Sequence, residues 1–218
     1  MPRISIVALL SAAVLAAPAS AAIRITEWLY SGAPGEFVRL TNIGMAPIDM
    51  TGWRFDDDSR ISSPVSATGS STEAFDLSGF GLVQPGESVI FTEVAPATFR
   101  TAWGIPGSVK VLGPFSNNLG RNDEINIYDA MENLIDRLTY GDQSFPGSIR
   151  TQDRSGVIPF AALGTNDPLA AVFADTLPGS ITNTSGVTGS AFLVPEPATL
   201  SLLALGGLLL VRRRQARQ

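Results

Sequence analysis

The chain has 218 residues and a formal net charge of −5, and it contains neither cysteine nor histidine. Disulfides, cysteine-ligated zinc, iron–sulfur clusters and the Ser-His-Asp triad are therefore excluded, together with the commonest transition-metal ligand. Glycine (21) and proline (15) are frequent and only 16% of residues are charged, a balance that favours short strands joined by turns over long helices.

The N-terminal segment combines a positive charge, an apolar run and a small-residue site. Arg3 precedes an uncharged apolar run over residues 4–17, and Ala19 and Ala21 follow in a small-x-small arrangement. This order is typical of a secretory signal peptide. We therefore expect residues 1–21 to be a signal helix that directs the protein to the secretion machinery. Signal peptidase would then remove it, with Ala19 and Ala21 at the cleavage site.

Residues 22–141 have the pattern of one all-β domain. Apolar residues alternate with polar ones in short runs, and turn-forming residues separate the runs. The expected strands cover residues 23–30, 36–42, 47–50, 52–55, 88–92, 109–112, 124–128 and 134–140. Regular spacing of short strands predicts a β-sandwich or barrel.

The strand expected at residues 36–42 illustrates how its two faces divide. Val38 and Leu40 share one face, whereas Arg39 and Thr41 share the other. Because side chains alternate along a strand, the first pair predicts the buried face and the second pair a face that leans toward solvent.

One short helix is expected between the strands, at residues 95–103. This segment has no alternation, and Phe99 and Trp103 stand four residues apart, as on one face of a helix. Gly104 follows directly and is a typical helix end.

The segment after the expected strands changes in composition. Residues 142–193 lose the strand pattern and are enriched in Gly, Ser, Thr, Pro and Ala. We expect them to form edge segments of the domain that pass into a flexible stalk.

The part of the chain between the two terminal signals is acidic. Residues 22–194 contain 10 Lys or Arg and 19 Asp or Glu, a formal charge of −9. This charge repels phosphate backbones, so nucleic acid is not an expected partner.

Asp56, Asp57 and Asp58 are the densest acidic group, and calcium prefers oxygen ligands of this kind. They lack the alternating spacing of an EF-hand loop, so the alternative interpretation is a solvated turn that binds no ion. No other cofactor is expected.

The C-terminal end has three parts in a fixed order. Pro195, Glu196 and Pro197 precede an apolar run over residues 198–211, and Arg212, Arg213, Arg214 and Arg217 follow that run. As a helix, the run predicts a single transmembrane segment that is short for the hydrocarbon core. The arginines favour a cytoplasmic end, which leaves the domain outside the cell.

Residues 194–218 resemble the PEP-CTERM sorting signal of Gram-negative bacteria. The resemblance implies an exosortase, a membrane protease-transferase, as the processing partner, often alongside exopolysaccharide production. Pro195, Glu196 and Pro197 would then be recognition residues. The alternative is a plain C-terminal anchor in which the prolines only break the chain before the helix.

Residues 22–141 resemble the lamin tail domain, an immunoglobulin-like β-sandwich. The segments that carry this resemblance are residues 25–27, 36–42, 48–53, 82–87 and 122–129, with Asp136 and Tyr140-Gly141 at its end. The family has no accepted catalytic residues and acts as an accessory or tethering module. The resemblance therefore implies a fold but no active site.

The sequence thus favours a non-enzymatic exported protein, anchored by its C-terminal helix until processing and then located at the cell surface or in the matrix. We expect a structural or adhesion role linked to exopolysaccharide or biofilm, with polysaccharide as a candidate partner. Two alternatives remain. One is an extracellular hydrolase that uses carboxylates and a divalent cation. The other is a carbohydrate-binding module in which Trp28, Trp53 and Trp103 stack on sugars, although apolar surroundings favour core packing for Trp53 and Trp103.

Overall fold

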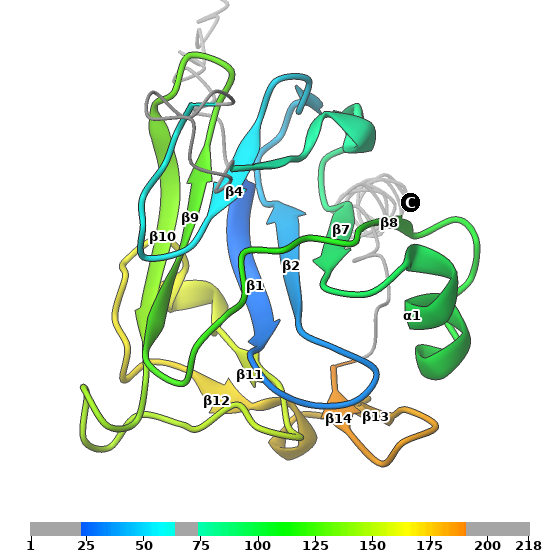
Figure 1. The fold of residues 1–218 in the computed structure, drawn as a ribbon, viewed down its shortest axis with the longest axis vertical. Helices are drawn as coiled ribbons and strands as arrows, with labels where there is room; N and C mark the ends of the chain where they lie inside the picture. The colour runs from blue at the N-terminus through cyan, green and yellow to red at the C-terminus, as the bar shows by residue number, and fades with distance from the viewer. Residues whose placement is uncertain (1–22, 64–73, 191–218) are drawn as a thin grey trace, which may run out of the picture.

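Two β-sheets form most of the part described by the computed structural model, which covers residues 23–63 and 74–190 (Figure 1). The sheets face each other and enclose the main apolar core. The predicted signal helix and the predicted C-terminal helix at residues 198–211 lie outside the described residues.

The larger sheet has six strands. In spatial order they are β12 (Val172–Phe173), β11 (Gly156–Val157), β1 (Ile23–Leu29), β2 (Phe37–Asn42), β7 (Ser88–Thr92) and β8 (Lys110–Leu112). All neighbours are antiparallel except β7 and β8, which are parallel. The register between β1 and β2 shifts between Ile25 and Glu27, so a bulge lies at this point of the sheet.

The smaller sheet has four strands and covers one face of the larger one. Its spatial order is β10 (Leu134–Tyr140), β9 (Asp123–Tyr128), β4 (Arg54–Asp56) and β5 (Phe75–Asp76), all antiparallel. The remaining elements are short: β3 (Ile48–Asp49), β6 (Leu82–Val83), β13 (Ile181–Thr182), β14 (Thr188–Gly189), η1 (Ser78–Phe80), η2 (Phe160–Ala162) and η3 (Ala174–Thr176).

The main core fills the space between the two sheets. Val38 and Leu40 of β2 point into it, as the alternation predicted. Phe91 lies at its centre, with the ring centroids of Phe55, Phe115 and Phe75 at 4.6, 5.7 and 6.2 Å. The domain is thus a β-sandwich, and its packing is rich in tilted and edge-to-face aromatic pairs.

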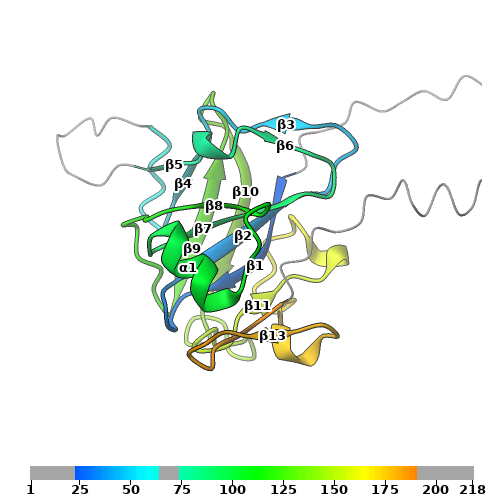
Figure 2. The same cartoon turned by 90° about the vertical axis from the view of Figure 1, so that its right-hand side faces the viewer.

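A third layer covers the outer face of the six-stranded sheet. It consists of helix α1 (Pro96–Trp103) and the β13–β14 hairpin (Figures 1 and 2). Phe99 and Trp103 of the helix pack with Phe37 of β2 in a second apolar cluster, at centroid distances of 5.4 and 5.5 Å. The helix begins with Pro96, and Gly104 ends it in a left-handed conformation, as the sequence predicted for Gly104.

This outer layer overturns one prediction about β2. Arg39 and Thr41 were expected to lean toward solvent, yet they are only 9% and 7% exposed. Thr41 Oγ1 lies 2.9 Å from both Thr26 Oγ1 and Ser88 Oγ. Both faces of β2 are therefore buried. The buried hydroxyl groups of Thr26, Thr41 and Ser88 form hydrogen bonds with one another.

The segment at residues 142–190 also differs from its prediction. In this segment, β11 and β12 extend the larger sheet beyond β1. The expected stalk does not extend over residues 181–190, which form a hairpin that packs on the sheet and places Val187 in the second cluster. Its strands are only two residues long, too short for a period-two pattern to reveal them.

Candidate functional site

The first predicted site, at Asp56, Asp57 and Asp58, works as a loop anchor. Asp56 is buried, and its carboxylate accepts hydrogen bonds from Asn117 Nδ2 at 2.7 Å, from Ser59 Oγ at 2.8 Å and from the Ile61 amide. Burial raises the pKa of Asp56, and the Ile61 and Ser59 hydrogen bonds oppose that rise. Both carboxylate oxygens therefore already accept hydrogen bonds from protein groups.

The neighbouring carboxylates do not join Asp56 around a common point. Asp57 Oδ1 accepts from the Ser59 amide at 2.9 Å, as in an Asx turn, and Asp58 is exposed. Within residues 23–63 and 74–190, no three carboxylates come close enough together to hold a metal ion. The geometry gives the predicted calcium site no support.

An ion-pair group on β9 and β10 was not predicted. The Arg60 guanidinium donates two hydrogen bonds of 2.7 Å to Glu124, and Arg137 Nε lies 3.6 Å from the same carboxylate. The Arg60 hydrogen bond lowers the pKa of Glu124 to about 2, with burial acting in the opposite direction. Asn126 Nδ2 and Thr139 Oγ1 also donate to Glu124, each at 3.3 Å, so the carboxylate fastens residue 60 to β9 and β10 of the smaller sheet.

A second acidic group lies at the start of β2 and β9. Glu36 Oε2 accepts from the Leu119 amide at 2.7 Å, and Asp123 Oδ2 accepts from the next amide, that of Gly120. The two carboxylates thus hold one loop by consecutive amides. Burial raises the pKa of Glu36 to about 8, an effect that the Leu119 amide opposes and that Glu93 and Asp123 increase.

This shift predicts a pH dependence of stability. From pH about 5 to pH about 8 Glu36 keeps its proton in the folded chain and loses it in the unfolded chain, so the stabilisation present at low pH is lost as pH rises. Glu36→Gln should therefore be more stable than the parent at pH 9, by on the order of 1 kcal/mol once solvent screening of a half-buried group is allowed for. Urea unfolding at pH 5 and pH 9 measures this difference.

The control for this prediction is Glu132→Gln, which changes an exposed glutamate on the β9–β10 turn. It should leave the pH profile of the parent unchanged. If the difference between Glu36→Gln and the parent is the same at pH 5 and pH 9, the raised pKa is wrong.

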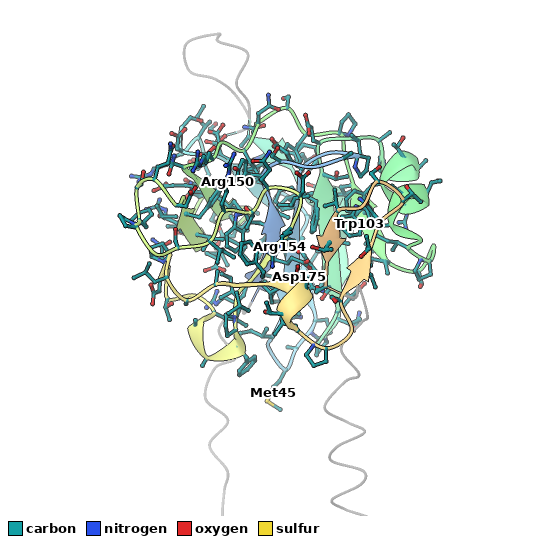
Figure 3. All side chains as sticks on the ribbon, turned by 90° about the horizontal axis from the view of Figure 1, so that it is seen from below. Met45, Trp103, Arg150, Arg154 and Asp175 are labelled. Atoms are coloured by element: carbon teal, nitrogen blue, oxygen red, sulfur yellow. The ribbon has the colours of Figure 1, made fainter. Side chains whose placement is uncertain are left out.

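The three tryptophans are buried and do not form a surface platform. Trp28, Trp53 and Trp103 are 1%, 5% and 5% exposed. A stacking platform needs an accessible ring face, so these residues cannot supply one in this fold. Trp28 packs on Tyr140 with a centroid distance of 5.4 Å, and Trp103 lies beside the β13–β14 hairpin (Figure 3).

No cleft suited to a hydrolase is apparent in the described part of the chain. A crevice with a volume of about 10 Å³ lies between β10 and the segment at residues 158–167. Ligand pockets usually have volumes of about 300 Å³ or more, so this crevice is far too small for one. Asp136 and Asp167 are its acidic lining residues, and Asp136 Oδ2 already accepts from the Ile25 amide at 2.8 Å. A two-metal mechanism needs more converging carboxylates than this.

A further buried group that the sequence did not reveal surrounds Glu27 on the outer face of β1. Its side chain is 0% exposed and lies 3.2 Å from Arg39 Nη2. It accepts hydrogen bonds from Ser155 Oγ and from both the amide and the hydroxyl of Ser190. Three distant parts of the chain therefore meet at one carboxylate. A charged residue inside an alternating strand was the only available signal, and it did not identify the partners.

The terminal signals lie outside the described residues. This holds for Ala19 and Ala21 and for the set Pro195, Glu196, Pro197, Arg212, Arg213 and Arg214. Among the residues that are described, no helix has the length and apolar character needed to cross a membrane. Four residues separate Ser190, the last described residue, from Pro195.

Comparison with known families gives two matches. The family model described as Lamin Tail Domain matches residues 16–142. The model described as PEP-CTERM protein-sorting motif matches residues 193–215. No curated protein matches the chain. The first match covers β1 to β10, whereas β11 to β14 lie beyond it.

Proposed function

Because the chain belongs to the lamin tail domain family and carries a PEP-CTERM sorting motif, we propose that it is a non-catalytic structural or adhesion protein of the cell surface or matrix. The observation that carries this proposal is the order of the parts along the chain: the lamin tail domain match ends at residue 142, further strands follow up to Gly189, and the sorting-motif match begins at residue 193. The motif indicates export and sorting by an exosortase, and the family is one of non-enzymatic modules.

The route to the surface follows from the two ends of the chain. Signal peptidase would cut after Ala21, and the run at residues 198–211 would hold the protein in the membrane. Fourteen residues in a helix extend about 21 Å, less than the roughly 30 Å thickness of the hydrocarbon core. A segment this short suits an anchor that keeps the protein in the membrane only until processing. The arginines from 212 onward would keep the tail in the cytoplasm.

The domain itself supports a binding or scaffolding role more than chemistry. Its buried carboxylates anchor loops and strands, as Asp56 and Glu27 do, and its crevice is small. The acidic composition favours solubility and disfavours nucleic acid as a partner. We propose extracellular polysaccharide as the surrounding material, contacted by surfaces other than the tryptophans.

The test changes the sorting motif in the exporting host. With Pro195, Glu196 and Pro197 all replaced by alanine, the protein should remain in the membrane fraction with its tail, because recognition is lost while the apolar run is kept. The parent should reach the surface as a shorter species. Fractionation followed by intact mass measures both.

The matched control is Gln218→Ala, which lies beyond the matched motif and should behave as the parent does. If the triple variant reaches the surface with the same mass as the parent, the motif does not direct sorting and the proposed route is wrong.

A further inference from the structure

The last described residues are held to β1 by a buried charge. Ser190 donates to Glu27 twice, from its amide at 2.8 Å and from its hydroxyl at 2.6 Å. Ser155 donates to the same carboxylate, and Arg39 Nη2 lies 3.2 Å from it. Hydrogen bonds to a charged acceptor are stronger than neutral ones, so this contact holds Ser190 firmly.

The residues just before Ser190 are also held to the domain. The Ser155 amide donates to the Thr188 carbonyl at 2.9 Å, and the Thr188 amide donates to the Asp153 carbonyl at 3.1 Å. Val187 is 2% exposed in the second apolar cluster. An added side-chain carbon at Gly189 would lie 2.9 Å from the Trp103 ring, so only glycine fits there without a shift. The hairpin is therefore docked along its second strand.

The contact of Ser190 with Glu27 limits how far the sorting motif can lie from the domain. With Ser190 docked, Ala198 follows eight residues later in the chain, and eight residues span at most about 28 Å. If the hairpin were released back to Leu177, the step to Ala198 would be 21 residues and would reach at most about 75 Å. The docked hairpin thus shortens the maximum reach more than twofold.

We propose that Glu27 is a latch that docks residues 181–190 and so limits how far the ectodomain can lie from the membrane-anchored sorting tail. This inference rests on the proposed function, because it takes the segment after Ser190 to be a sorting tail. The latch sets the position of the Pro195-Glu196-Pro197 motif at most about 18 Å from the Ser190 position. The processing enzyme would then meet the motif directly beside a folded domain.

A purely structural role for Glu27 predicts a different pattern of exchange. A latch protects the hairpin locally, whereas a general core residue protects the whole domain. Loss of the Ser190 contact, which keeps the Glu27–Arg39 pair, should therefore accelerate amide exchange in residues 183–190 and leave the central strands β2 and β7 unchanged. Loss of a core residue should accelerate all of them together.

The experiment is hydrogen exchange with mass spectrometry on the purified full chain. Ser190→Ala removes one of the two bonds from Ser190 and keeps the buried charge, and Glu27→Gln removes the charge. Ser180→Ala is the control, because Ser180 is an exposed serine of the same segment. We expect exchange at Val187 and Thr188 to be at least about tenfold faster in Ser190→Ala, faster still in Glu27→Gln, and unchanged in the control.

Two results would overturn the latch. One is unchanged exchange in Ser190→Ala, and the other is an equal acceleration of the hairpin and of β2 and β7 in that variant. The exchange measurement does not depend on sorting, so the two proposals can fail separately. If the exchange results support the latch but the tail is not processed in the host, only the proposed function is wrong. If sorting is normal but the exchange results show no latch, only the latch is wrong.

Discussion

Arg39→Ala is expected to lower the free energy of unfolding by about 3–5 kcal/mol. Arg39 is 9% exposed and lies 3.2 Å from Glu27, which is fully buried. Removing one partner of a buried ion pair leaves the other charge uncompensated in a region of low dielectric, and this cost exceeds that of losing the pair as a whole. Urea unfolding followed by tryptophan fluorescence measures the difference.

The comparison variant is Arg121→Ala, which removes a shorter ion pair whose two side chains are only half-buried. Arg121 lies 2.5 Å from Asp142, and the two side chains are 35% and 22% exposed. Surface pairs contribute about 0–1 kcal/mol, so this variant should stay close to the parent. Equal losses in the two variants would mean that the outer layer does not bury the Glu27–Arg39 pair.

Phe91→Ala is expected to be destabilising by a similar amount, about 3–5 kcal/mol. Phe91 is fully buried on β7, and the rings of Phe55, Phe75 and Phe115 surround it. The loss combines apolar transfer with a cavity that three aromatic rings cannot easily close. Thermal unfolding of the variant should show a correspondingly lower midpoint.

Phe160→Ala is the matched control for Phe91→Ala. Phe160 is 77% exposed on η2, and removing an exposed ring should change stability by less than about 0.5 kcal/mol. A loss at Phe160 as large as that at Phe91 would show that the η2 turn packs against something other than solvent. A small loss at both positions would contradict the central place of Phe91 in the core.

The sandwich was predictable because its long strands carry a strong alternating pattern. The expected strand at residues 88–92 coincides with β7, and the strand at 134–140 coincides with β10. The helix was also predictable, since Phe99 and Trp103 share a face and Gly104 ends it. In these elements one buried face determines the pattern, and that face is visible in sequence.

The outer layer was not predictable from the same pattern. Whether Arg39 meets water depends on α1 and on the β13–β14 hairpin, which comes more than 140 residues later in the chain. The hairpin strands have two residues each and carry no period of their own. Tertiary contacts with distant segments, rather than local propensity, therefore decide the burial of β2.

The candidate sites divide in the same way. Asp56, Asp57 and Asp58 are adjacent in sequence and suggested a cation site, but hydrogen bonds to Ser59 and Asn117 use the first two carboxylates separately. Glu27, Ser155 and Ser190 are far apart in sequence and meet in space. A spacing rule detects neighbours along the chain and cannot detect a site built from three separate segments.

The most direct test of the account is the intact mass of the protein recovered from the cell surface. We expect a chain that begins at Ala22 and lacks the arginines from 212 onward. A species of 218 residues, recovered from the cytosol with both ends uncut, would contradict export and sorting together.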